Sequence, residues 1–326
     1  MSIRDEFNDA AEEWYALEEG SFPALPSAEG GAVIAVRGLL PLPVQDTPGF
    51  RAASGVVEAA LLILSQSPHA RRMAQTALAQ KYSVRIGSAT QSSEWAEASG
   101  HTDIANRVIH AGAETDPLKL ALVIAHELAH VAQADKGFNF SVTNKKPEAA
   151  MRELMVMEGD ARAHEFIVAL ELAYKMPGDP DERLLFPAAI DAVSDSLGSD
   201  LTRKIIAHFR PQFPEIDRDE MMARVFKSFY GSLALRAHYE ASVQTALNDP
   251  AVRLLDDSAF VKDFDAAAAL QKLGGYAIKA AKYLDLDAPQ MAGLTQSGQD
   301  GINQWRARRA AAATSAPTAK PKAAAP

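Results

Sequence analysis

Residues 120–137 read LALVIAHELAHVAQADKG, and this stretch places two histidines and a glutamate inside an apolar helical run. It is apolar on nearly every face, which is typical of a buried central helix. Thr115 or Asp116 can cap its start, Pro117 suits its first turn, and Gly137 suits the position just beyond its end. Burying an ionisable trio is unfavourable unless its members find partners. The stretch therefore predicts a buried helix whose polar side chains are satisfied by a shared ligand.

The spacing of the trio indicates a metal ion. His126 and His130 are four residues apart, so both imidazoles leave the helix on one face, one turn apart. Glu127 follows about 100° further round the helix, where a general base can take a proton from metal-activated water. The pattern is the HExxH motif, and it predicts one zinc ion per chain. Iron, cobalt or manganese can occupy a site of two histidines and a carboxylate in other settings.

A zinc site of this kind needs a third protein ligand and keeps one position open. The extended motif with a third histidine is absent, because Gln133 and Lys136 stand where its glycine and histidine would be. A cysteine ligand is excluded because the chain contains no cysteine. Glu158, on the next expected helix, is the favoured third ligand, and the small Gly159 beside it permits a close approach of the two helices. Three further candidates lie in the same segment: Glu153, Asp160 and His164.

The remaining patterns predict a mostly helical α+β fold, with a small sheet beside the HExxH helix and additional flanking helices. Helices are expected over residues 1–20, 50–66, 68–81, 117–136 and 147–175, and short strands over 32–36, 82–89 and 106–112. Four regions follow from these patterns: an N-terminal helical and loop region (1–82), a core with the motif (83–176), a C-terminal helical region packed on the core (177–310) and a disordered tail (311–326).

Composition narrows the class of protein. The chain has 326 residues, a net charge of −9 and no cysteine, so a broad electrostatic grip on nucleic acid and disulfides are not expected. The one local basic cluster, around Arg306, Arg308 and Arg309, suits the end of a helix. The acidic start lacks a secretory signal, and no apolar run is long and uncharged enough to suggest a membrane span. A cytoplasmic protein without nucleic-acid or membrane partners is expected.

At these residues the chain resembles the gluzincin zinc metallopeptidases, with HELAH on one helix and a glutamate on the next. More narrowly, VIAHELAHVAQ followed by MEGDARAHE is similar to a poorly characterised family of bacterial metallopeptidases, over about residues 83–175. The resemblance implies that His126, His130 and Glu158 bind zinc and that Glu127 is the catalytic acid and base in peptide hydrolysis. One departure is Arg162, which stands where many gluzincins carry an aspartate that orients the first histidine.

Two further residues are candidates for substrate binding. The segment 106–112 is expected to be an edge strand that holds an extended peptide by main-chain pairing, which places His110 near the cleft. Tyr239 is a candidate donor to the developing oxyanion. His238, Tyr230 and His164 are alternatives for that role.

Three functions remain open at this point. The first is a zinc-dependent peptidase acting on a peptide or protein substrate, with Glu127 as general base. The second is a non-catalytic or partner-regulated binding protein that keeps the zinc fold, since the C-terminal helices exceed what a minimal peptidase needs. The third is a helical protein without metal, in which the trio is packing.

Overall fold

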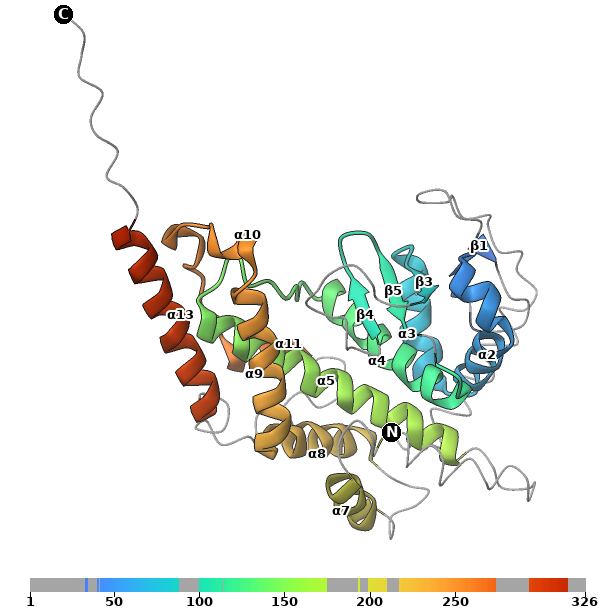
Figure 1. Ribbon diagram of the computed structural model, residues 1–326. Coiled ribbons are helices and arrows are strands. Elements are labelled where there is room, and N and C mark those ends of the chain that lie inside the picture. The colour runs from blue at the N-terminus through green and yellow to red at the C-terminus, as the bar shows by residue number, and fades with distance from the viewer. Residues whose placement is uncertain are drawn as a thin grey trace, which may run out of the picture.

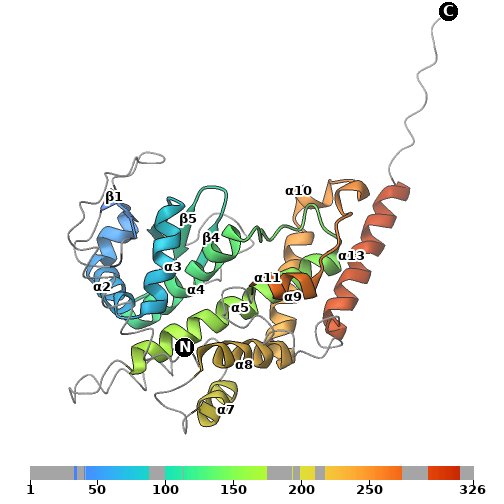
Figure 2. The same ribbon diagram turned by 180° about the vertical axis from the view of Figure 1, so that it is seen from behind.

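The computed structural model describes residues 33–34, 40, 42–87, 100–112, 114–174, 193, 199–209, 217–273 and 293–315 of the chain. The fold is mostly helical α+β, as the sequence predicts. The sheet and helices α2 to α4 gather at one end of the molecule and α9 to α13 at the other (Figure 1), and the long helix α5 joins the two ends. Figure 2 shows the same arrangement from behind. The helix expected over residues 1–20 lies outside the described residues.

The sheet has the strand order β1-β2-β3-β5-β4. Its strands are short: β1 (Val33–Ile34), β2 (Val44–Gln45), β3 (Ser83–Ile86), β4 (Gly100–Asp103) and β5 (Val108–Ala111). β3 pairs in parallel with β2 and β5, while β4 pairs antiparallel with β5. The strands β1, β3 and β5 fall where the sequence predicts them, but β2 and β4 were not expected.

The position of β5 corrects one prediction. The segment 106–112 was expected to form an edge strand, but β5 pairs on one side with β3 and on the other with β4. Both of its backbone edges are therefore used, and it cannot accept a peptide strand. Among the described strands it is β4 that ends the sheet on this side, next to α4.

Two capped helices, α2 (Pro48–Ser65) and α3 (Pro68–Ala79), pack on α4. The side chains of Thr47 and Ser67 accept hydrogen bonds from the first turns of α2 and α3. By length and composition alone, α2 is apolar enough to cross a membrane, a test that core helices of soluble proteins also pass. Its residues Val57, Leu61 and Leu64 are fully buried, which places one face of α2 in the core.

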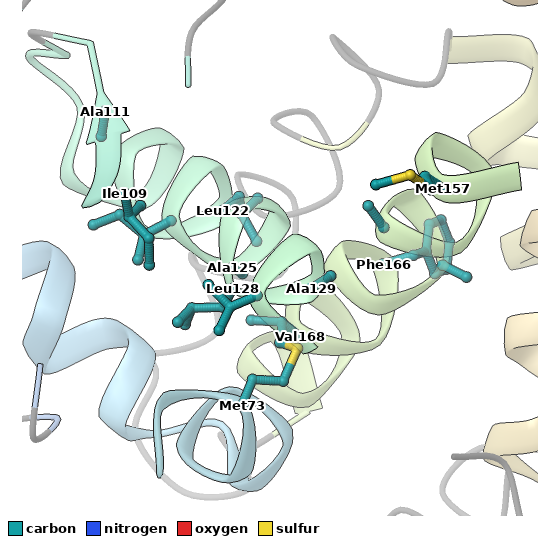
Figure 3. Packing of buried hydrophobic residues seen from close by; sticks show 14 of the residues in the cluster. Met73, Ile109, Ala111, Leu122, Ala125, Leu128, Ala129, Met157, Phe166 and Val168 are labelled. Carbon is teal, nitrogen blue, oxygen red and sulfur yellow. The ribbon is translucent and has the colours of Figure 1, made fainter. Parts of the chain in front are cut away.

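The centre of the molecule is formed by α4 (Pro117–Asp135) and α5 (Pro147–Tyr174), which pack on each other. Asp116 caps α4 as the sequence predicts, and Gly137 adopts a φ of +82° just beyond its end. Figure 3 shows apolar side chains of β5, α3, α4 and α5 meeting in one core. This core fixes the two helices that carry the candidate metal ligands.

The C-terminal helices pack on α5 and on one another. They are α7 (Ser199–Phe209), α8 (Arg218–Gly231), α9 (Leu233–Leu247), α10 (Pro250–Arg253), the 3-10 helix η3 (Asp257–Ala259), α11 (Ala266–Leu273) and α13 (Gln296–Ser315). Helices α8, α9 and α11 contact α5, and α13 contacts α9. Because α13 ends at Ser315, it includes residues 311–315, which were expected to belong to a disordered tail. Residues 316–326 lie outside the described part of the chain.

Candidate metal centre

The two histidines of the HExxH motif converge on one point. The Nε2 atoms of His126 and His130 are 3.2 Å apart, and their rings stand at 81° to each other. Both rings leave the same face of α4, as the four-residue spacing requires. His126 is buried and His130 is nearly so.

Glu158 faces both histidines from α5. Its Oε2 lies 3.3 Å from His126 Nε2, and its Oε1 lies 3.5 Å from His130 Nε2. Glu158 is buried, so it is not a solvated acid. The structure thus brings together the three side chains that the sequence favours as ligands.

The three other candidates for the third ligand are engaged elsewhere. Glu153 pairs with Lys145 at 2.6 Å. Asp160 accepts a hydrogen bond from Gln133 at 2.8 Å. His164 contacts His69 at 2.6 Å. None of these pairings involves the two motif histidines.

Gly159 has a different role from the one expected. A Cβ atom there would lie 3.0 Å from Phe226 and 3.1 Å from Phe229, both on α8. The small residue therefore permits the close packing of α5 against α8. It does not face the HExxH helix.

The spacing of these atoms fits a single metal ion. In a tetrahedral zinc site with ligand bonds of about 2.0–2.1 Å, neighbouring ligand atoms lie about 3.3 Å apart. The 3.2 Å between the two Nε2 atoms matches that spacing, and each Nε2 has one oxygen of Glu158 at a similar distance, Oε2 at 3.3 Å from His126 and Oε1 at 3.5 Å from His130. Independently of Glu158, potential ligand atoms of His126, Glu127 and His130 lie within 4.8 Å of one another. The donor set of two imidazoles and a carboxylate suits a divalent transition metal.

The electrostatics of the site favour a bound cation. Burial alone would raise the pKa of Glu158, but its hydrogen bonds to His126 and His130 hold that pKa well below its ordinary value. Burial would lower the pKa of His130, but the hydrogen bond and charge of Glu158 raise it to about 9. Without a metal, the carboxylate therefore holds protons on the imidazoles that a metal ion would displace.

An acid that sequence reasoning missed supports His126. Glu165 Oε2 lies 3.2 Å from His126 Nδ1, and Arg162 Nη1 donates to the same oxygen at 2.6 Å. Glu165 lies seven residues after Glu158, two helical turns, so both acids share one face of α5. Arg162 stands where the aspartate was expected, and it donates to Glu165. Glu165, one turn further along α5, makes the contact with His126 that the aspartate would make. The seven-residue spacing is the signal that could have found it.

Glu127 is held by the unexpected strand β4. Thr102 Oγ1 lies 2.7 Å from Glu127 Oε2 and 3.0 Å from the Glu127 carbonyl oxygen, and its single hydroxyl proton is shared between these two acceptors. A Cβ atom on Gly100 would lie 2.7 Å from Glu127 Oε1, so only glycine fits there without displacing the carboxylate. Sequence reasoning missed both residues because the segment 100–103, with the sequence GHTD, has no apolar alternation.

The two candidate substrate residues lie on different sides of the site. Tyr239, on α9, accepts from Arg162 Nη2 at 3.1 Å and hydrogen bonds Glu158; burial is the main cause of its raised pKa. His110, on β5, stacks against His101 of β4 with ring centroids 6.1 Å apart. The pKa of His101 is lowered chiefly by burial, and it responds to the charges of Glu127 and His130. His101 is therefore a further polar group near the site that the sequence did not reveal.

A small mixed sheet, a buried HExxH helix and a glutamate brought to it by the next helix define the class of metallopeptidases. The chain belongs to the family described as "Putative metallopeptidase family (DUF6782)", whose model matches residues 37–253. The match extends beyond the residues on which the resemblance was based and includes α2, α3, α8 and α9. Comparison with curated proteins and with solved structures found no match.

Proposed function

We propose that this protein is a zinc-dependent peptidase of the gluzincin type, with His126, His130 and Glu158 as zinc ligands and Glu127 as general base. The observation that carries the proposal is the convergence of two imidazole nitrogens on the two oxygens of the Glu158 carboxylate, with contacts of 3.2, 3.3 and 3.5 Å, beside the buried Glu127. Membership of the metallopeptidase family supports it at the level of class. The net charge of −9 favours a peptide over a nucleic acid as substrate.

When bound, zinc would lower the pKa of a water molecule and polarise the scissile carbonyl group. Glu127 accepts the proton of the attacking water and passes it to the leaving nitrogen as the peptide bond breaks. Thr102 holds the Glu127 carboxylate in place for this transfer, and Gly100 leaves the space that the carboxylate occupies. Glu165 keeps the proton of His126 on Nδ1, so that Nε2 faces the metal.

Two neighbouring elements supply the rest of the proposed substrate site. An extended peptide pairs with the outer side of β4, which among the described strands is the last one on this side of the sheet and carries Thr102 next to Glu127. From the opposite side, the phenol of Tyr239 remains protonated because its pKa is raised. Its one proton, which is directed to Glu158 in this structure, would turn to the carbonyl oxygen as negative charge develops there.

The test combines metal content with hydrolysis. Purified wild type should contain one zinc per chain by elemental mass spectrometry, and His126→Ala should contain none. Glu127→Gln should keep its zinc and lose roughly 100- to 10,000-fold in peptide hydrolysis, the usual range for a lost general base. Hydrolysis retained by Glu127→Gln would refute its assigned role.

The same measurement separates the peptidase from a non-catalytic zinc protein. Cleavage of a peptide library that disappears in Glu127→Gln excludes the non-catalytic function. Zinc bound at one per chain with no Glu127-dependent cleavage of any peptide favours it. Absence of zinc after reconstitution excludes both and leaves the trio as packing.

A further inference from the structure

A chain of buried polar side chains runs from the metal centre into the helices α3 and α8. It begins at His130 and passes through the side chains of Gln133, Asp160, His164, His69 and Arg218. Gln133, Asp160, His164 and His69 are all buried. Nothing in the proposed reaction uses these residues, yet burying them is unfavourable unless their hydrogen bonds are satisfied.

At the metal centre, the hydrogen bond between His130 and Gln133 can have only one direction of donation. Gln133 Nε2 lies 2.8 Å from the carbonyl oxygen of Met157, which can only accept, so this atom of the amide is the nitrogen. The other amide atom, Oε1, therefore faces His130 Nδ1 at 2.9 Å and accepts its proton. With one proton held on Nδ1, Nε2 is the nitrogen of His130 that can bind a metal ion once the ion displaces the proton that Glu158 holds there.

The hydrogen bonds at the other end, from Arg218 through His69 to His164, also have only one direction of donation, because a guanidinium can only donate. Arg218 donates to Nδ1 of His69, so the proton of this imidazole lies on Nε2. His69 Nε2 then donates to His164 Nδ1 at 2.6 Å, and the Nε2 proton of His164 faces Asp160 Oδ2 across 3.6 Å. Both imidazoles are neutral: burial lowers the pKa of His164 to about 4 and that of His69 well below its ordinary value.

Every donor in this chain therefore points toward Asp160. Its carboxylate receives Gln133 Nε2 at 2.8 Å from one side and faces His164 from the other. A negative charge behind an amide polarises it, and the polarised Oε1 accepts more strongly from His130. Stronger acceptance at Nδ1 makes Nε2 a better electron-pair donor to a metal ion.

We infer that Asp160, acting through Gln133, is a positioning residue that prepares His130 to bind metal, and that His164, His69 and Arg218 hold Asp160 in place. The inference rests on the proposed function, because it concerns the same metal site. It gives His130 an orienting acid, as Glu165 does for His126, but one amide further away. It also links α3 and α8 to the metal centre through hydrogen bonds and the 3.6 Å contact between His164 and Asp160.

The first test compares Asp160→Asn with Glu153→Gln. Both replace a buried carboxylate of α5 by its amide, but Glu153 pairs with Lys145, outside the chain of hydrogen bonds. Zinc affinity is measured on the full-length, zinc-free protein by competition with a chromophoric chelator. We expect Asp160→Asn to weaken zinc binding roughly 10- to 100-fold, the usual effect of losing an orienting partner, and Glu153→Gln to leave it unchanged.

A second variant removes the link itself. Gln133→Met should weaken zinc binding about as much as Asp160→Asn, and the double variant no more than either, because both changes interrupt one path. The absorption spectrum of the cobalt-substituted protein should change in Gln133→Met and Asp160→Asn, because the orientation of the His130 ligand changes. The spectrum of Glu153→Gln should stay that of the wild type. If Asp160→Asn fails to fold, Gln133→Met makes the same comparison alone.

The outcomes separate this inference from the proposed function. Zinc bound by the wild type with equal affinity in Asp160→Asn and Gln133→Met overturns the inference and leaves the zinc site standing. Wild type that binds no zinc overturns both. Two zinc ions per wild-type chain, reduced to one in His164→Leu, would make His69 and His164 a second metal site and also overturn the inference.

Discussion

Two pairs of histidines lie in the same core, all buried except His130, which is nearly so, and each pair has its ring centroids 4.9 Å apart. The pair His126 and His130 is edge to face and opens both Nε2 atoms toward Glu158. The pair His69 and His164 is stacked at 9° and closed by a direct nitrogen-to-nitrogen hydrogen bond.

The charged side chains next to the two pairs also differ. Glu158 raises the pKa of His130, whereas burial and Arg218 lower the pKa of His69. Residue type therefore does not decide whether a buried histidine pair can hold a metal. We expect the surrounding side chains to decide it, because Glu158 presents its carboxylate to both Nε2 atoms of the first pair, whereas Arg218 and a direct hydrogen bond engage the ring nitrogens of the second.

The largest difference between the two pairs is expected when the carboxylate beside each pair is changed. Glu158 and Glu171 are both buried on α5, and Glu171 accepts from Ser67 and from the backbone of His69. We expect Glu158→Gln to abolish zinc binding, because the charge shared by both imidazoles is lost. Glu171→Gln should bind zinc as the wild type does. Isothermal titration of zinc into each zinc-free variant measures the difference; equal loss in both would contradict the comparison.

A smaller effect is expected on the free energy of unfolding at acidic pH, through the pair His69 and His164. The pKa of His164 is about 4 in the folded protein, because of burial, and near 6.5 when unfolded. Between these values the unfolded chain binds more protons, so the free energy of unfolding falls as the pH falls from 6.5 toward 4. At pH 5 the loss from His164 alone is about 2 kcal/mol.

Urea unfolding of the zinc-free protein at pH 7 and pH 5 checks this value. His164→Asn is the matched variant: it should be less stable than the wild type at pH 7 but should lose about 2 kcal/mol less on moving to pH 5. His69 adds to the loss in both proteins to a different extent, since its pKa is lowered partly by the charge of His164. An identical pH response of the two proteins would show that His164 is not buried in neutral form.

The contrast between the pairs also explains what the sequence could reveal. His126 and His130 are visible because a four-residue spacing is a local signal within one helix, and the cap at Asp116 marks where that helix begins. His69 and His164 are 95 positions apart and meet only because α3 packs on α5. No local pattern announces such a contact.

The same reasoning applies to the rest of the site. Glu158 could be proposed because it lies on the next helix. Glu165 lies on the same expected helix, but its contact with His126 depends on which face of α5 packs against α4, and this was not predicted. The strand β4 was missed because its sequence GHTD lacks an apolar face; its pairing with β5 and the bond from Thr102 to Glu127 hold it in place. Without β4, the strand β5 was wrongly taken as the edge.

The smallest effect concerns the pH dependence of zinc binding at the first pair. Because Glu158 raises the pKa of His130 to about 9, zinc must displace a proton from His130 throughout the range below that value. Zinc affinity should therefore rise at least about tenfold from pH 7 to pH 8, since His130 releases one proton per ion bound and His126, whose pKa is also raised, adds to that release. A histidine with its ordinary pKa of 6.5 would already be neutral there, and affinity would be nearly flat. Chelator competition at pH 7.0, 7.5 and 8.0 distinguishes the two cases, with proton release in weak buffer as an independent count. A plateau above pH 7 would mean that Glu158 does not hold a proton on His130, and the electrostatic contrast between the two pairs would then be lost.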